Sequence, residues 1–125
     1  MADCERGVVL VVDDDREWRD LVALALGWAG IPAVTASDGI EALRALRGGA
    51  ERPAAIVLDL TMPRLTGWEF RAVQLRDAAL RDIPVIVVSG DELGPIAPQR
   101  YLRKPCTPDA LLEAVREVLP LRNAA

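Results

Sequence analysis

The chain has 125 residues, a formal net charge of −4 and no histidine. This length fits one domain, spanning 1–125 with a core of about 7–119, and supplies enough apolar surface to fold without disulfides. The lack of histidine excludes Ser-His-Asp and Cys-His nucleophile arrangements and histidine zinc sites. Acids and bases are interspersed without a Lys/Arg-rich run, so we expect no direct nucleic-acid binding.

The N-terminal residues lack the basic-then-apolar order of a signal peptide. No apolar run reaches membrane-spanning length, so we expect a cytoplasmic protein without a membrane contact. Cys4 precedes one predicted strand and Cys106 follows another. These positions lie at opposite ends of a parallel sheet, roughly 20 Å apart, whereas a disulfide needs Cα atoms within about 7 Å. We therefore expect two free thiols.

Taken in chain order, the predicted strands are Val8–Val12, Ile31–Thr35, Ala54–Leu58, Ile83–Val88 and Gln99–Arg103. The first, third and fourth are continuous apolar runs rich in Val and Ile, which is typical of strands buried on both faces of a parallel sheet. The second contains Pro32, which cannot donate a ladder hydrogen bond, so this strand belongs at a sheet edge.

Helical patterns lie between the strands. The first helix is Arg16–Trp28 and is stopped by Gly30. A capping box at Asp38 begins a second helix that ends at Gly48-Gly49, and another at Thr66 begins a third that extends to about Leu80. Thr107-Pro108 begins the last helix, which extends to Leu119. Leu21, Leu24 and Trp28 share helical spacing, and we expect all three tryptophans to be packing residues. Alternating strands and helices predict right-handed βαβ units and a doubly wound α/β sheet.

Polar residues follow four of the five strands at the edge where ligands bind in open α/β sheets. Asp13, Asp14 and Asp15 follow the first strand and Asp59 the third. Ser89-Gly90-Asp91 follow the fourth strand, and Lys104 follows the fifth. Acids, a hydroxyl and one cation should therefore converge.

Converging acids require a counter-ion. Two carboxylates about 4 Å apart repel by about 4 kcal/mol at an effective dielectric of 20. One lysine does not balance three carboxylates, and their hard oxygens suit Mg²⁺, which keeps open positions for phosphate oxygens. The alternative is that Asp13–Asp15 merely cap the next helix, and we expect Asp15 to do so. The pattern favours phosphoryl chemistry at a carboxylate, with Lys104 and Ser89 contacting the same oxygens.

The motifs Val-Val-Asp13-Asp14, Leu58-Asp59-Leu-Thr61-Met-Pro63 with Gly67, Val-Ser89-Gly90 and Tyr101-Leu-Arg-Lys104-Pro105 resemble those of response-regulator receiver domains. The resemblance extends from Val8 to about Leu119. It implies a CheY-like, flavodoxin-like fold with a five-stranded parallel sheet in the order 2-1-3-4-5. It also implies a two-component phosphorelay, in which a histidine kinase or histidine phosphotransfer protein is the donor and another protein is the downstream target.

By position, the resemblance makes Asp59 the phosphoacceptor. It makes Asp14 and Asp59 direct Mg²⁺ ligands, adds the Thr61 backbone carbonyl, and lets Asp13 act through water. Lys104 would hold a phosphoryl oxygen, Ser89 and Tyr101 would form the switch pair, and Gly90 would admit the phosphoryl group. The side chains of Thr61 and Asp91 would tune hydrolysis. A cis peptide before Pro105 is common in the family. Such a domain promotes its own phosphorylation and dephosphorylation and is not a turnover enzyme.

The segment between Ser89 and Lys104 departs from the family pattern. It is about two helical turns too short, and Gly94, Pro95 and Pro98 oppose a helix. We therefore predict that the fourth helix is absent or reduced to one turn, which alters the usual output surface. This departure leaves open a receiver-like module that signals without phosphorylation. A haloacid-dehalogenase-type phosphatase would need a second acid where Thr61 stands, and the acids of the first loop exclude a phosphate-cradling flavodoxin.

Overall fold

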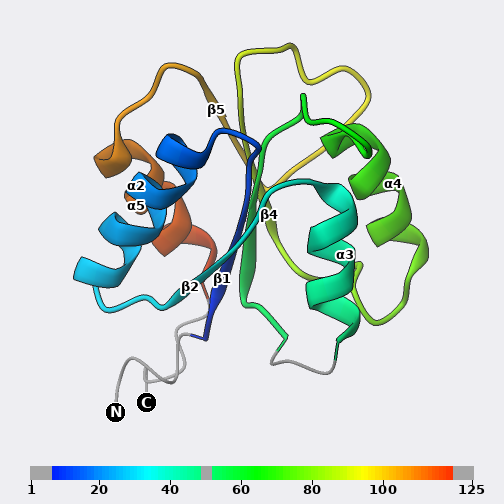
Figure 1. The fold of residues 1–125 in the computed structure, drawn as a ribbon, viewed down its shortest axis with the longest axis horizontal. Coiled ribbons are helices and arrows are strands. Elements are labelled where there is room, and N and C mark those ends of the chain that lie inside the picture. The colour runs from blue at the N-terminus through cyan, green and yellow to red at the C-terminus, as the bar shows by residue number, and fades with distance from the viewer. Residues whose placement is uncertain (1–6, 49–51, 120–125) are drawn as a thin grey trace.

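The fold is a parallel sheet covered by helices on both faces, seen in a computed structural model that describes residues 7–48 and 52–119 (Figure 1). The strands are β1 (Val9–Val12), β2 (Ala33–Ala36), β3 (Ala55–Leu58), β4 (Val85–Ser89) and β5 (Arg100–Arg103). The helices are α2 (Arg16–Trp28), α3 (Gly39–Arg47), α4 (Gly67–Arg76) and α5 (Pro108–Val118). All neighbouring strands pair in parallel, in the order β2-β1-β3-β4-β5, which confirms the predicted topology.

Strands β1, β3 and β4 are buried along their whole length, as their continuous apolar runs predict. Their side chains alternate between two core clusters because successive residues point to opposite faces. In β1, Val9 and Val11 join the cluster beneath α2 and α5, whereas Leu10 and Val12 join the cluster on the α3 and α4 side. The sheet thus divides the core into two layers.

Strand β2 is a sheet edge, as Pro32 predicts. The strand begins one residue after this proline, and the Pro32 carbonyl accepts a hydrogen bond of 3.0 Å from the Val9 N–H. Val34 remains half exposed on the open edge.

The helix starts follow the capping residues seen in the sequence. Asp15, Asp38, Thr66 and Thr107 are the N-caps of α2, α3, α4 and α5, and each side chain accepts from backbone N–H groups of the first turn. Gly30, just beyond α2, has a φ of 82° that suits its role as a stop.

Helix α4 is shorter than predicted: it ends at Arg76 and does not continue to Leu80. The Asp77 carboxylate accepts a hydrogen bond from the Ala79 N–H and favours a turn. In addition, the buried Gln74 amide donates to the carbonyls of Leu80 and Ile83, which holds the chain outside the helix. These local side-chain bonds outweigh the helical pattern of the sequence.

The apolar residues of α2 form two stripes, and only one of them faces the core. Val22 and Leu26 are buried, whereas Leu21, Leu24 and Trp28 are exposed. The expectation that Trp28 is a packing residue is wrong, because this side chain is 82% exposed. The other two tryptophans, Trp18 and Trp68, do pack against the core clusters, as expected. Cys106 is a free thiol, and Cys4 lies outside the described residues.

The segment from Gly90 to Gln99 contains no helix, which confirms the predicted loss of the fourth helix. It is an extended loop with one turn at Gly94-Pro95, where Gly94 has a φ of 65°. None of the helices described here has the length and apolarity needed to cross a membrane.

Candidate functional site

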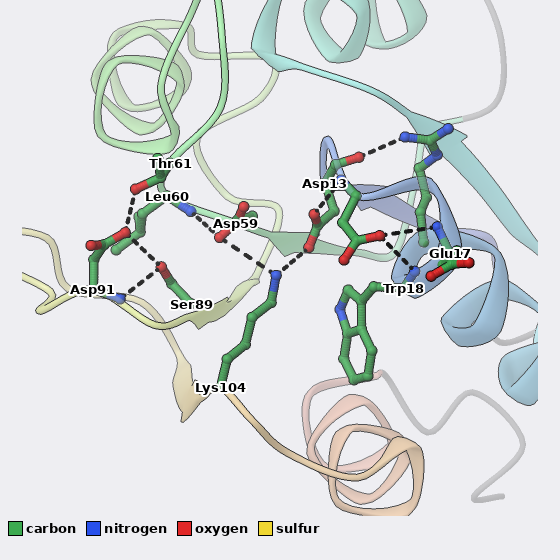
Figure 2. Close-up of polar contacts among 11 residues, drawn as sticks. Asp13, Glu17, Trp18, Asp59, Leu60, Thr61, Ser89, Asp91 and Lys104 are labelled. Carbon is green, nitrogen blue, oxygen red and sulfur yellow. Dashed lines mark hydrogen bonds and ion pairs between the residues drawn. The ribbon is translucent and has the colours of Figure 1, made fainter.

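Polar residues from four strand ends meet at one edge of the sheet (Figure 2). Asp13 follows β1, Asp59 follows β3, Ser89 ends β4, and Lys104 directly follows β5. The alternation of the sequence dictates this meeting, because parallel strands place all their carboxyl ends at the same edge.

Three carboxylates form the centre of the site. Asp13, Asp14 and Asp59 each place an oxygen within 4.8 Å of the others. Asp13 and Asp59 are only 3% and 7% exposed, whereas Asp14 is open to solvent. Burial, together with the charge of Asp13, raises the pKa of Asp59 from 3.8 to about 6, although Lys104 acts in the opposite direction. The fold therefore keeps an unfavourable concentration of negative charge at Asp59.

Lys104 is the cation that reaches this cluster. Its Nζ lies 2.8 Å from Asp13 Oδ2 and 3.9 Å from Asp59 Oδ1 (Figure 2). Burial disfavours its charge, but the hydrogen bond and charge of Asp13, together with Asp59, outweigh burial and raise its pKa above the usual lysine value. The ammonium also lies 5.9 Å from the centroid of the Trp18 ring. The Lys104-Pro105 peptide is cis, as the family resemblance implies.

Hydroxyl groups and Asp91 occupy the other side of Asp59. The fully buried Ser89 Oγ accepts a hydrogen bond of 3.2 Å from the Asp91 N–H. The Thr61 hydroxyl donates to Asp91 Oδ2, and the Tyr101 hydroxyl donates to the Asp91 backbone carbonyl at 2.9 Å. Asp91 thus connects Ser89, Thr61 and Tyr101.

Only part of the acidic triplet belongs to the carboxylate cluster. The Asp15 side chain accepts from the N–H groups of Glu17 and Trp18 and caps α2, as expected. Asp13 Oδ1 accepts from the Asp15 N–H at 2.9 Å, which fixes the turn between strand and helix. The first and third acids of the triplet therefore have different roles.

The backbone around Asp59 is tightly constrained. Its Oδ1 accepts a hydrogen bond of 2.9 Å from the Leu60 N–H. Gly67, the first residue of α4, donates to the Leu60 carbonyl at 2.8 Å, and a Cβ at this glycine would lie 2.3 Å from the Asp59 carbonyl oxygen. By contrast, a Cβ added at Gly90 would meet nothing within 4 Å.

The donor chemistry of the cluster fits a hard divalent cation such as Mg²⁺. Its donors are carboxylate oxygens only, two of them on nearly buried residues, and burial together with their mutual repulsion raises the pKa of Asp59. Lys104 neutralises one charge of the three. A divalent ion would remove the remaining excess.

The first turn of α2 brings two further contacts to the site, and the contact of Arg19 is not among the sequence predictions. The Arg19 Nη1 donates to the Asp13 carbonyl at 2.7 Å, and the Trp18 ring lies beside Lys104. Both residues belong to the first turn of α2, which begins directly after the acidic triplet. The helical register alone places residues 18 and 19 near that loop, so this signal was available in the sequence.

Comparison with known proteins identifies one family and relatives that belong to it. Residues 9–116 match the response regulator receiver domain family. The chain is 37% identical over 121 residues to response regulator MprA of Mycobacterium ulcerans and of Mycobacterium avium, covering 89% of this chain. It spans about half the length of these curated relatives, namely 49% and 50%.

Solved structures show the same fold. The chemotaxis protein CheY4 of Vibrio cholerae aligns with a TM-score of 0.79 and 30% identity, covering 90% of this chain and 98% of that one. The phosphorylated cyanobacterial phytochrome response regulator RcpA aligns with a TM-score of 0.77 and 27% identity, covering 93% and 99%.

Proposed function

Because this chain belongs to the response regulator receiver domain family, we propose that it accepts a phosphoryl group on Asp59 from a phosphohistidine of a partner kinase or phosphotransfer protein. The observation that carries the proposal is the position of Asp59. Its carboxylate lies close to two further acids and to Lys104, at the carboxyl edge of the sheet. A carboxylate so placed is suited to receive phosphate rather than to support the fold.

In the proposed reaction, a carboxylate oxygen of Asp59 attacks the phosphorus in line with the leaving nitrogen. The P–N bond breaks, its electron pair stays on the histidine ring, and an acyl phosphate forms on Asp59. Asp59 must be ionised to attack, and with a pKa of about 6 it is mostly ionised at neutral pH. Lys104, now bound to Asp13, moves to a phosphoryl oxygen to stabilise the added charge.

Asp13, Asp14, Asp59 and the Thr61 backbone carbonyl would hold Mg²⁺, with Asp13 acting through water. Bound there, the ion would neutralise charge on the phosphoryl oxygens. The protein itself supplies the acids and keeps them close together.

The switch acts through Asp91. A phosphoryl oxygen on Asp59 offers the Ser89 hydroxyl a stronger acceptor than Asp91 Oδ2, which is 3.5 Å away. Loss of that contact, with repulsion between Asp91 and the new charge, alters the loop that Tyr101 contacts through the Asp91 carbonyl. Thr61 and Asp91 also flank the approach of water and so set the lifetime of the acyl phosphate.

The proposal is tested by incubating the protein with acetyl phosphate and Mg²⁺ and measuring the intact mass. One phosphate should be added, stable to acid but labile to base and hydroxylamine. Asp59→Asn should abolish the addition, whereas Asp82→Asn, at an exposed acid remote from the site in the chain, should retain it. A phosphate found mainly on Ser89 or Thr61 would contradict the assignment of Asp59.

The second candidate function is an interaction module that works without phosphorylation. The observation in its favour is the missing helix between β4 and β5. This candidate would be supported if the parent protein gained no phosphate from acetyl phosphate and if the Asp59→Asn variant bound the partner as tightly as the parent.

A further inference from the structure

A groove lies beside α4. This helix covers the face of the sheet opposite α2 and α5 (Figure 1). Helix residues Trp68, Arg71, Ala72 and Leu75 form one wall, and loop residues 95–97 form the other. Its volume is about 420 Å³, and its lining is mostly apolar apart from Arg71. One wall of this groove therefore belongs to the loop that stands where receiver domains are expected to have their fourth helix.

Arg71 is the unusual member of this lining. Its side chain is only 6% exposed, yet it forms no ion pair with any residue of 7–48 or 52–119. The Nη1 donates to Gln74 Oε1 at 2.8 Å and the Nη2 to the Ala97 carbonyl at 3.2 Å, both of which are neutral acceptors. The buried Nε has no hydrogen-bond partner among the described residues.

A buried cation without a counter-ion is costly, and here burial lowers the pKa of Arg71 below its usual value. Holding the loop does not explain this cost. The Trp68 indole N–H already donates to the Leu93 carbonyl at 2.9 Å, and a single neutral donor would suffice for Ala97. A guanidinium brings five donors in a fork that matches a carboxylate.

The loop wall also has free backbone donors. Pro95 and Pro98 have no N–H, and the N–H groups of Ile96 and Ala97 donate to no acceptor in the described part of the chain. Neighbouring residues of an extended chain point their N–H groups to opposite sides, so an extended peptide lying along this wall can accept from one of the two. A small carboxylate would leave that donor unused.

We propose that the groove between α4 and loop 95–97 binds an extended segment of a partner protein in which Asp or Glu adjoins a large apolar residue. The carboxylate pairs with the Nε side of Arg71, and the apolar side chain lies against Trp68, Leu75 and Pro95. Because Nε is covered, Ile96 and Ala97 must shift slightly as the segment enters. Binding does not require phosphorylation of Asp59, so this proposal can fail independently of the proposed function.

The test uses the acetylated and amidated peptide Gly-Leu-Asp-Leu-Gly and its matched neutral form Gly-Leu-Asn-Leu-Gly. Both are titrated into the ¹⁵N-labelled protein, to millimolar concentrations because contacts this few give dissociation constants of about 1 mM. The expected result is saturable shifts of the Trp68 indole N–H and of the Ile96 and Ala97 amides. The acidic peptide should bind about tenfold more tightly than the neutral one, which is equivalent to about 1.4 kcal/mol.

Arg71→Met should remove the preference for the acidic peptide, and Arg76→Met, at an exposed arginine at the end of the same helix, should preserve it. Because a substitution at a buried residue can disturb folding, Leu75→Glu provides a second variant. Leu75 is 50% exposed, so the fold should persist while the added charge repels the acidic peptide.

Equal affinity for both peptides, shifts confined to another surface, or no saturable shift at all would overturn the proposal. Tighter binding of free 4-methylpentanoate than of the acidic peptide would indicate a small-molecule site, which also overturns the assignment of a protein partner.

Discussion

The raised pKa of Asp59 makes a direct prediction about stability: Asp59→Asn should stabilise the metal-free protein at neutral pH. Asparagine has nearly the shape of the protonated acid and keeps an oxygen for the hydrogen bond from the Leu60 N–H. The substitution removes the repulsion from Asp13 and Asp14 and the cost of burying a charge. It also removes the attraction to Lys104, 3.9 Å away, which is already included in the pKa.

The size of the effect follows from the two pKa values of Asp59, 3.8 ordinarily and about 6 in the fold. At about 1.4 kcal/mol for each pH unit, their difference amounts to about 3 kcal/mol. Solvent entering the open site reduces this value, so we expect the free energy of unfolding to rise by roughly 2–3 kcal/mol. For a domain of this length, that corresponds to an increase of roughly 5–15 °C in the midpoint of thermal unfolding.

The pH dependence has a definite sign. Because the folded pKa of Asp59 is raised, the folded state holds its proton more tightly, and the metal-free protein loses stability as pH rises from about 4 to 6. Below pH 4 the side chain is protonated in both states, so the parent protein and Asp59→Asn should differ little. The difference should grow between pH 4 and 6 and remain constant above that range.

Urea unfolding followed by circular dichroism, on protein freed of metal by a chelating resin, measures this difference at each pH. Asp82→Asn serves as the control for a general loss of negative charge. The electrostatic account of the site would be refuted if Asp59→Asn were no more stable than the parent at pH 7.5, or if its gain were the same at pH 4 and pH 7.5.

Three further outcomes are expected. At a free concentration ten times its Kd, Mg²⁺ should stabilise the parent by about 1.4 kcal/mol, which raises the midpoint of a thermal melt by roughly 4–7 °C. Asp14→Asn should raise the midpoint of the metal-free protein and lose most of the rise caused by Mg²⁺. An unchanged rise with Mg²⁺ would make Asp14 structural. Lys104→Ala should still bind Mg²⁺ but show a smaller tryptophan fluorescence change with beryllofluoride, and an equal change in both proteins would rule out the proposed role. Asp38→Ala should cost about 1–2 kcal/mol above pH 4, because Asp38 caps α3 and pairs with Arg64 at 2.7 Å. Burial raises the pKa of Asp38, but its hydrogen bond from the Glu41 N–H and its pairing with Arg64 outweigh burial and lower it, so the charge-dependent part of this cost should disappear as pH falls below 3.8, which urea titrations would reveal.

The sequence predicts the sheet well because the evidence for it is local. Continuous Val- and Ile-rich runs mark β1, β3 and β4, and Pro32 marks the edge position of β2. The cap residues locate helix starts for the same reason, since each cap acts within one turn. Gly94, Pro95 and Pro98 likewise predict the missing helix from their own backbone preferences.

The errors arise where specific side-chain contacts or tertiary packing decide, rather than backbone preferences. Helix α4 stops early because Gln74 reaches the carbonyls of Leu80 and Ile83, and no local pattern announces that contact. Trp28 is exposed because α2 carries two apolar stripes, and only tertiary packing selects the one with Val22 and Leu26.

The acids of the site are predictable because they lie at strand ends. The bonds that Asp91 forms with Thr61 and Tyr101 are not, because they depend on how a loop without regular structure folds back. The sequence likewise does not reveal that Arg71 lacks an ion pair among the described residues, because this depends on which side chains pack around it.

The contact between Gly67 and the end of β3 has a mechanical consequence. No side chain lies between the first residue of α4 and the backbone of Asp59 and Leu60, so nothing compressible can absorb a displacement there. A change in the backbone at Asp59 therefore acts directly on the start of the helix. Over the ten residues of α4, a lever of about 15 Å, a small rotation at Gly67 is amplified toward the far end of the helix. Trp68 and Arg71 lie near the pivot and Leu75 near the tip, so movement of the strand end would change the width of the groove unevenly along its length.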